Sequence, residues 1–239
     1  MVKTRLAVFD IDGTIFRSSL VVELSRALVA AGIFPKTALR EMSREYLAWL
    51  DRKGTYQAYI NRVVEIYNRR IAGQSLKRAR RVAAGVIAQQ KDRVYRFSRD
   101  LIKQCRRQNY FLAAISGSPS YIVELYARGM GFDWFCGTEL EVAGGKFTGR
   151  VANLDPALRK DKVIRQLVGG YPALNLSRSL AVGDTESDIA MLKLVGRPIA
   201  FNPNQELAAA ARRHGWRLVV ERKDMIYEIR DFRAAAGRR

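Results

Sequence analysis

The segment from Asp10 to Thr14 constrains the fold more than any other part of this 239-residue chain. It follows Leu6-Ala7-Val8-Phe9, a short apolar run that predicts a buried strand. Asp10 and Asp12 are two residues apart on an extended segment, so they point to the same side, and Gly13 lets the chain turn away at once. Carboxylates are seldom buried for packing alone. This pair therefore predicts a site at the carboxyl edge of an α/β sheet, where ligands bind.

The composition fits a folded globular protein, with 48% hydrophobic and 27% charged residues. No apolar run reaches the ~18 residues that a membrane span needs. The residues before the first strand, Met1 to Arg5, contain no apolar core of a signal peptide. The two cysteines, Cys105 and Cys136, fit reduced thiols better than a disulfide framework. We therefore expect a cytoplasmic protein with no membrane partner.

The chain has a single histidine, His214, which precedes Gly215 in a predicted helix end. We interpret it as a surface residue near a helix C-terminus rather than as a catalyst. Because catalytic triads and most zinc sites use histidine, both classes of site are disfavoured.

Residues 17–97 have the pattern of an all-helical insertion. Ser18 or Ser19 can cap a first helix whose apolar residues recur every four positions. The apolar spacing and the glycines that follow predict helices ending near Gly32, Gly54 and Gly73, and a fourth helix from Leu76 to Gln89.

Positive charge is concentrated in this helical insertion. The formal net charge of the chain is +19, and residues 17–97 hold 17 Lys and Arg against 6 Asp and Glu, a net charge of +11. Such a surface favours anionic partners: phosphorylated substrates, nucleic acid or anionic membranes. An arginine-rich composition without a specific partner is the alternative.

Alternation of strands and helices resumes after the insertion. Strands are predicted near residues 110–115, 179–182, 199–201 and 216–220, a hairpin over 139–151, and helices over 99–107 and 157–168 and up to residues 126, 194 and 214. This order predicts an α/β fold, a Rossmann-like parallel sheet with helices on both faces and an all-helical cap inserted after the first strand. We divide the chain into a core (1–16 and 98–233), the helical insertion (17–97) and a flexible tail (234–239).

Polar groups also lie at the ends of three further predicted elements. They are Ser116 and Gly117 after a strand, Lys160 or Lys162 at the start of a helix, and Asp184 and Asp188 after another strand. Several acids with one lysine and one serine pack poorly, but they suit a Mg²⁺ ion, which prefers carboxylate and carbonyl oxygens. The metal and the lysine would offset the charge of a phosphoryl group that a carboxylate attacks.

The ordered set Asp10-x-Asp12-Gly13-Thr14, Ser116-Gly117, Lys160 and Gly183-Asp184-x-x-x-Asp188 resembles the haloacid dehalogenase superfamily of phosphatases. The resemblance covers nearly the whole chain. The helical insertion after the first motif resembles the cap of the phosphoserine phosphatase-like branch.

The resemblance implies a role for each acid of the first motif. Asp10 would be the nucleophile and form an aspartyl-phosphate. Asp12 would protonate the leaving alcohol and then take a proton from the hydrolytic water. This division of roles calls for a low pKa at Asp10 and a raised pKa at Asp12.

It also implies which groups hold the phosphate and the metal. Ser116, the Gly117 amide and Lys160 would bind the phosphoryl oxygens. A Mg²⁺ ion would be held by Asp10, the Asp12 carbonyl, Asp184 and Asp188, the last of them directly or through water.

Two lysines, Lys160 and Lys162, are candidates for the lysine of the third motif in this ordered set. From Lys160, apolar residues fall at Val163, Ile164 and Leu167, which matches the pattern of the family. From Lys162 the apolar residues are less regular, so we favour Lys160 and interpret Lys162 as a surface charge.

The chain departs from phosphoserine phosphatases where they recognise the substrate. Ser19 stands where they carry a glutamate, Ser187 where they carry an asparagine, and Ser118 where they carry a second glycine. Glu23, one helical turn beyond Ser19, could substitute for that glutamate, but its default interpretation is an exposed helix residue. The charge of the insertion instead indicates a substrate with a second phosphate or a carboxylate.

The sequence therefore predicts a Mg²⁺-dependent phosphatase that acts on a small anionic phosphomonoester through an aspartyl-phosphate. The alternatives are a phosphoserine phosphatase proper or a phosphotransferase that passes the phosphoryl group to another acceptor. A polyanion- or nucleic-acid-binding protein that uses the basic insertion is a different class. We do not favour it, because binding alone would need neither Asp12 nor Lys160.

Overall fold

The structure of the chain, a computed structural model, describes residues 2–229. The tail predicted over 234–239 and the last residues of the predicted core lie outside this range. No helix within the described range is both long enough and apolar enough to cross a membrane.

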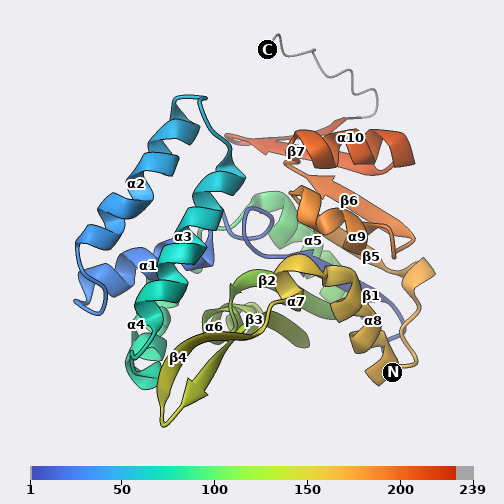
Figure 1. Cartoon of the computed structure of the whole chain (residues 1–239). Helices are drawn as coiled ribbons and strands as arrows, with labels where there is room; N and C mark the ends of the chain where they lie inside the picture. Colours follow the sequence, from blue (N-terminus) through green and yellow to red (C-terminus); the bar gives the residue numbers. More distant parts are fainter. Residues whose placement is uncertain (1, 230–239) are drawn as a thin grey trace.

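The described residues build one eight-stranded sheet in the order β4-β3-β2-β1-β5-β6-β7-β8 (Figure 1). Its strands are β1 Leu6–Asp10, β2 Phe111–Pro119, β3 Trp134–Ala143, β4 Lys146–Asn153, β5 Leu180–Gly183, β6 Arg197–Phe201, β7 Arg217–Arg222 and β8 Met225–Ile229. The six central strands, β3, β2, β1, β5, β6 and β7, pair in parallel. The two edge strands, β4 and β8, pair antiparallel with their neighbours. The predicted fold class, a mainly parallel sheet of the Rossmann type, is confirmed.

Helices cover both faces of this sheet. They are α1 Leu20–Ala30, α2 Thr37–Leu50, α3 Tyr56–Ile71, α4 Leu76–Gln90, α5 Arg96–Arg107, α6 Ser120–Gly129, α7 Asp155–Leu158, α8 Lys160–Gly170, α9 Ile189–Leu192 and α10 Gln205–His214. Side chains alternate along β1: Ala7 and Phe9 join the cluster under α5, α6 and the helical insertion, while Leu6 and Val8 pack under α8, α9 and α10.

The helices of the insertion form where the apolar spacing predicts them. Thr55 caps α3, because its hydroxyl accepts a hydrogen bond from Ala58 N at 3.1 Å. Helix α4 buries Ala79 and Ala83 on one side, as expected, and leaves its basic residues on the other. In Figure 1, α2 and α3 stand side by side next to the sheet.

The loop between α3 and α4 is bonded to the hairpin formed by β3 and β4. Gly73 N donates to Phe147 O at 2.7 Å, Phe147 N to Gln74 O at 3.0 Å, and Leu76 N to Gly145 O at 3.0 Å. We call these three backbone hydrogen bonds the hairpin tether. Through them one end of the helical insertion is attached to the sheet.

Side chains add to the attachment at the same end of the insertion. The buried hydroxyls of Tyr67 on α3 and Tyr121 on α6 lie 2.7 Å apart. Arg80 on α4 forms an ion pair of 2.9 Å with Glu124 on α6. Helices α3 and α4 are therefore held against α6 as well as against the hairpin.

Several details differ from the sequence prediction. The helix expected over 157–168 is two helices, since Arg159 leaves the helical region with φ −137° and ψ 53° and Lys160 begins a new helix. The chain beyond 220 adds the antiparallel strand β8, whose exposed side chains gave no clear alternation. His214 is the last residue of α10 and is exposed, as expected, with Gly215 in the left-handed conformation after it.

Candidate active site

The site lies at the carboxyl edge of three neighbouring strands. β1 ends at Asp10 between β2 and β5, with Asp10 opposite Ile115 of β2 and Phe9 opposite Val182 of β5. Because all three strands run in the same direction, the residues after them meet at one edge. The segments that carry the first, second and last motifs are therefore adjacent.

Lys160 lies at the centre of the carboxylate cluster. Its Nζ is 2.5 Å from Asp10 Oδ1 and 2.5 Å from Asp188 Oδ1, and its side chain is 3% exposed. Lys162 lies outside the cluster, half exposed, in an ion pair of 2.7 Å with Asp155. The break at Arg159 explains this placement, because the new helix begins with Lys160 directed inward.

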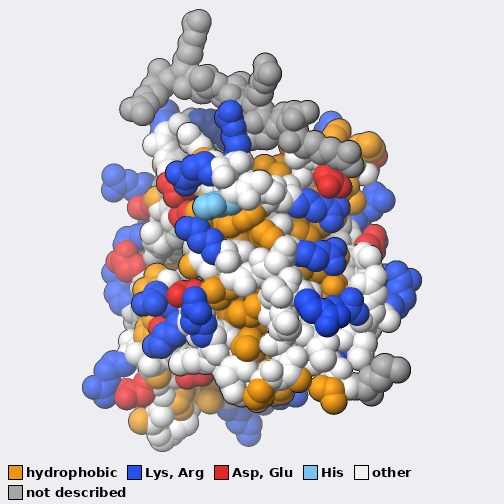
Figure 2. All heavy atoms as spheres, turned by 90° about the vertical axis from the view of Figure 1, so that its right-hand side faces the viewer, with side chains coloured by type: hydrophobic (Ala, Val, Ile, Leu, Met, Phe, Trp, Pro, Cys, Tyr) orange, Lys and Arg blue, Asp and Glu red, His pale blue; other side chains and the backbone are white. Residues whose placement is uncertain are grey.

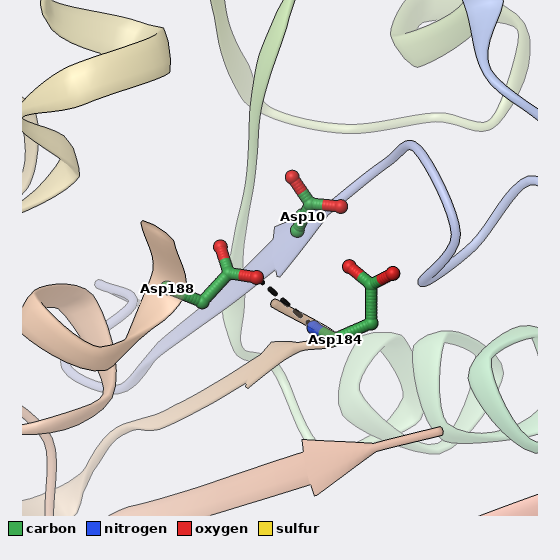
Figure 3. A group of neighbouring side chains, drawn as sticks. All are labelled: Asp10, Asp184 and Asp188. Atoms are coloured by element: carbon green, nitrogen blue, oxygen red, sulfur yellow. Dashed lines mark hydrogen bonds between the residues drawn. The ribbon is translucent and has the colours of Figure 1, made fainter. Parts of the chain in front are cut away.

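Asp184 and Asp188 are fixed by the loop that joins β5 to α9. Asp188 Oδ2 accepts hydrogen bonds from Asp184 N at 2.9 Å and from Thr185 N at 3.1 Å. Asp184 Oδ1 accepts one from Thr14 Oγ1 at 3.1 Å. Figure 3 shows the side chains of Asp10, Asp184 and Asp188 around a common space.

Two glycines make this close approach possible. Gly13 has a φ of +83°, and a Cβ at this position would overlap the carboxylate of Asp184. A Cβ at Gly183 would overlap the side chain of Asp188. The space that these side chains would fill is occupied by the acids of the site.

Asp12 is held apart from the other three acids. Its Oδ1 accepts a hydrogen bond of 2.5 Å from Leu20 N at the start of α1. Its Oδ2 accepts from Ser118 Oγ at 3.0 Å and from Ser116 Oγ. Asp12 thus occupies the positive end of α1, the role that we expected of Ser18 or Ser19. The side chain of Ser19 makes no capping bond, because Asp12 already takes the first amide of the helix.

The second motif lies within β2 and not after it, since the strand continues to Pro119. Besides its bond to Asp12, Ser116 Oγ accepts from Ser118 N at 2.9 Å. Gly117 lines the cavity described below, and its carbonyl accepts from Thr138 Oγ1 at 2.8 Å. The phosphate-binding candidates of this motif therefore lie next to Asp12.

Burial sets the electrostatics of the cluster. Removal from water raises the pKa of Asp10 to about 8, although the ammonium of Lys160 acts in the opposite direction. Burial also raises the pKa of Asp184 well above its usual range. Burial alone would lower the pKa of Lys160, but Asp10 and Asp188 outweigh it and raise that pKa. The low pKa that we expected at Asp10 is therefore not found, because one lysine does not balance three acids.

The unbalanced acids fit a hard divalent cation. One carboxylate oxygen from each of Asp10, Asp184 and Asp188 lies within 4.8 Å of the others. Asp10 Oδ2 is buried without a hydrogen-bond partner among the described residues, which is costly unless another group meets it. Carboxylate oxygens are the donors that such a cation prefers.

Glu23 does not lie in the cavity over the site. It is 8% exposed and accepts hydrogen bonds from Ser18 Oγ at 2.7 Å and Gln90 Nε2 at 3.0 Å. The interpretation of Glu23 as an exposed residue was wrong, because α4 packs over it. Ser19 and Ser187 do line the cavity.

Sequence reasoning gave no role to Ser118. This residue is 2% exposed, donates to Asp12 and accepts from Val21 N at 3.1 Å. Its hydroxyl therefore joins Asp12 to the first turn of α1. The serine two positions after Ser116 was visible as a departure from the family, but its partner on α1 is distant in sequence.

The fold and the carboxylate cluster define a class of hydrolase, and the comparison with known families agrees. The profile of the haloacid dehalogenase-like hydrolases matches residues 7–193, so the chain belongs to this family. The match includes all four motifs.

Proteins similar to this chain include some that are named phosphoserine phosphatases. A phosphoserine phosphatase of Mycobacterium tuberculosis is 27% identical over 97% of this chain and 72% of its own length. The crystal structure of a protein of unknown function from Bordetella pertussis covers 91% of this chain and 98% of its own, with a TM-score of 0.71 and 23% identity. A phosphoserine phosphatase in a phospho-aspartyl intermediate analogue covers 87% and 91%, with a TM-score of 0.59 and 21% identity. The resemblance inferred from the motifs is confirmed at the level of family and fold.

Proposed function

We propose that the chain is a phosphatase that hydrolyses a phosphomonoester through an aspartyl-phosphate on Asp10, with Mg²⁺ as cofactor. The observation that carries the proposal is the arrangement of the two acids of the first motif. Asp10 belongs to the cluster with Lys160, while Asp12 lies against hydroxyls and the N-terminus of α1. Two carboxylates in such different surroundings suit two different roles.

The first half of the reaction transfers the phosphoryl group to the enzyme. The carboxylate of Asp10 attacks phosphorus, and the bond between phosphorus and the oxygen of the alcohol breaks. Asp12 donates its proton to that oxygen, so that the product leaves as a neutral alcohol. Lys160 stays beside Asp10 and offsets negative charge that builds up on the phosphoryl oxygens.

The second half restores the enzyme. Asp12, now a carboxylate, takes a proton from a water molecule whose oxygen attacks phosphorus. The bond between Asp10 and phosphorus breaks, and inorganic phosphate leaves. The Leu20 amide and the hydroxyls of Ser116 and Ser118 hold Asp12 in place through both steps.

Asp10, Asp184 and Asp188 are the side chains that would hold the Mg²⁺ ion. The ion would supply the positive charge that the cluster lacks and would neutralise the phosphoryl group. The orphaned oxygen Asp10 Oδ2 supports this assignment.

Replacement of the nucleophile tests the proposal. Asp10→Asn is expected to abolish phosphate release from 4-nitrophenyl phosphate in Mg²⁺, while the matched surface variant Lys162→Gln keeps it. The wild-type chain should form a beryllofluoride adduct, and Asp10→Asn should not. Hydrolysis by Asp10→Asn at the wild-type rate would overturn the mechanism. A product analysis with added glycerol separates hydrolysis from phosphotransfer, since transfer would yield glycerol phosphate in place of phosphate.

A further inference from the structure

The site opens into a cavity of about 620 Å³ between α3 and the carboxyl edge of the sheet. Pockets of this size enclose a whole small molecule. The cavity therefore has room for a leaving group well beyond the phosphoryl oxygens, and its walls describe the alcohol that fits.

One wall is a face of α3. Its cavity-lining residues recur at helical spacing: Tyr56, Gln57, Ile60, Asn61, Val64, Glu65, Tyr67 and Asn68. Three of them are carboxamides, which donate and accept hydrogen bonds without carrying charge. Gln57 Nε2 donates to Asn61 Oδ1 at 2.8 Å, which leaves the Gln57 carbonyl and the Asn61 amide group for a ligand.

Another part of the lining is hydrocarbon. It consists mainly of Leu140 on β3, Leu154 before α7 and Leu158 at the end of α7. Leu154 is 41% exposed and Leu158 is 68% exposed, values high for leucine side chains beside a polar site. Contact with an apolar part of a ligand would remove this surface from water.

The charge of the cavity contradicts our expectation from the basic insertion. Among the described residues that line it, Lys160 is the only lysine or arginine, and its ammonium already contacts Asp10 and Asp188. Apart from the acids of the first and last motifs, the other charged lining residues are Glu65 and Glu186. A carboxylate or second phosphate on the leaving group would find no lysine or arginine among the described lining residues except Lys160, which is already paired.

Basic residues of the insertion near the cavity are paired with acids or face solvent, and none of those described lines the cavity. Arg62 donates to Glu65 at 2.8 Å, and Arg80 pairs with Glu124. Arg78 and Arg81 are exposed on α4 and do not line the cavity. Figure 2 shows that the face turned away from the insertion also carries many Lys and Arg side chains among apolar ones. Positive charge is thus not confined to the insertion.

We propose that the substrate is the phosphomonoester of an uncharged alcohol, with hydroxyl or amide groups along the side that meets α3 and hydrocarbon along the side that meets the leucines. Gln57, Asn61 and Asn68 are the residues that select it. This inference rests on the proposed phosphatase function and names the substrate class of the same site.

Matched pairs of esters that differ in one charge test it. Glycerol 3-phosphate is compared with 3-phosphoglycerate, and phenyl phosphate with 4-carboxyphenyl phosphate, by kcat/KM in Mg²⁺. We expect the uncharged member of each pair to be favoured at least tenfold. An equal or higher kcat/KM for the carboxylate members would overturn the inference. Calorimetry measures the affinity of Asp10→Asn for the same esters without turnover, and we expect the same order of preference. Esters that are hydrolysed slowly therefore still test the inference.

Two variants locate the effect. Asn61→Arg adds a cation to the exposed part of the wall. It is expected to lower the ratio of kcat/KM for phenyl phosphate to kcat/KM for 4-carboxyphenyl phosphate at least tenfold. Arg78→Gln removes a cation from the outer side of α4 and should leave the preference unchanged. If Arg78→Gln lost activity selectively toward the carboxylate esters, the positive surface of α4 would be shown to bind the substrate, and the inference would be wrong.

The two levels of proposal fail in different ways. Activity retained by Asp10→Asn would remove the proposed function. Loss of activity in Asp10→Asn together with a preference for the charged esters would leave the phosphatase intact and remove only the neutral leaving group.

Discussion

Replacement of Lys160 should destabilise the protein far more than replacement of Lys162 two residues away. Lys160 is 3% exposed and touches two buried carboxylates, so Lys160→Met leaves their charge without a partner. Removal of one member of a buried ion pair costs about 3–5 kcal/mol. In a chain of this length, about 1 kcal/mol corresponds to about 2–4 °C in Tm. We expect Tm to fall by about 6–20 °C.

Lys162→Met provides the matched control. Its pair with Asp155 is half exposed, and such pairs contribute about 0–1 kcal/mol, which predicts a fall of at most about 4 °C. Thermal unfolding is followed by circular dichroism in EDTA, so that no divalent cation replaces the missing ammonium. Equal falls in Tm for the two variants would refute the assignment of Lys160 as the internal cation of the cluster.

Three further changes act on neighbouring parts of the site. Ser118→Ala removes the acceptor of a buried amide, at a cost of about 1–3 kcal/mol, and should lower both Tm and kcat; an unchanged Tm would show that water replaces the hydroxyl. Gly13→Ala should abolish turnover and weaken Mg²⁺ binding by calorimetry, whereas Gly32→Ala, also at positive φ but in open space, should preserve both. Mg²⁺ at 100 times its dissociation constant should stabilise the wild type by about 2.7 kcal/mol in thermal unfolding; the same stabilisation of Asp184→Asn would argue against Asp184 as a ligand.

The parts of the fold that were predicted well depend on local sequence. Apolar residues at helical spacing predicted a helix that ends near Gly73, and α3 ends at Ile71; the run before Asp10 located β1. Four short motifs located the sheet edge, although the second of them lies within the end of β2 and not after it.

The remaining features depend on contacts between distant residues. The burial of Glu23 follows from Gln90, 67 residues further along the chain. The capping of α1 by Asp12 follows from the path of the loop between them. The scarcity of basic residues along the cavity could not be predicted from net charge, because charge counts do not show which side of a helix faces the site.

The hairpin tether has a consequence for how the active site admits its substrate. The three backbone hydrogen bonds attach the C-terminal end of α3, while Tyr56 and Gln57 lie at the opposite, N-terminal end. Together with the contact between Tyr67 and Tyr121, these hydrogen bonds hold the C-terminal end of α3, so that an outward movement of the helix would be smaller there than near Tyr56. The turn of the hairpin at Gly144-Gly145 takes part in the tether and so helps to set the position of α3. A change of hairpin length would therefore shift the carboxamides of α3 relative to Asp10, so that substrate choice can change without substitution of any residue that touches the substrate.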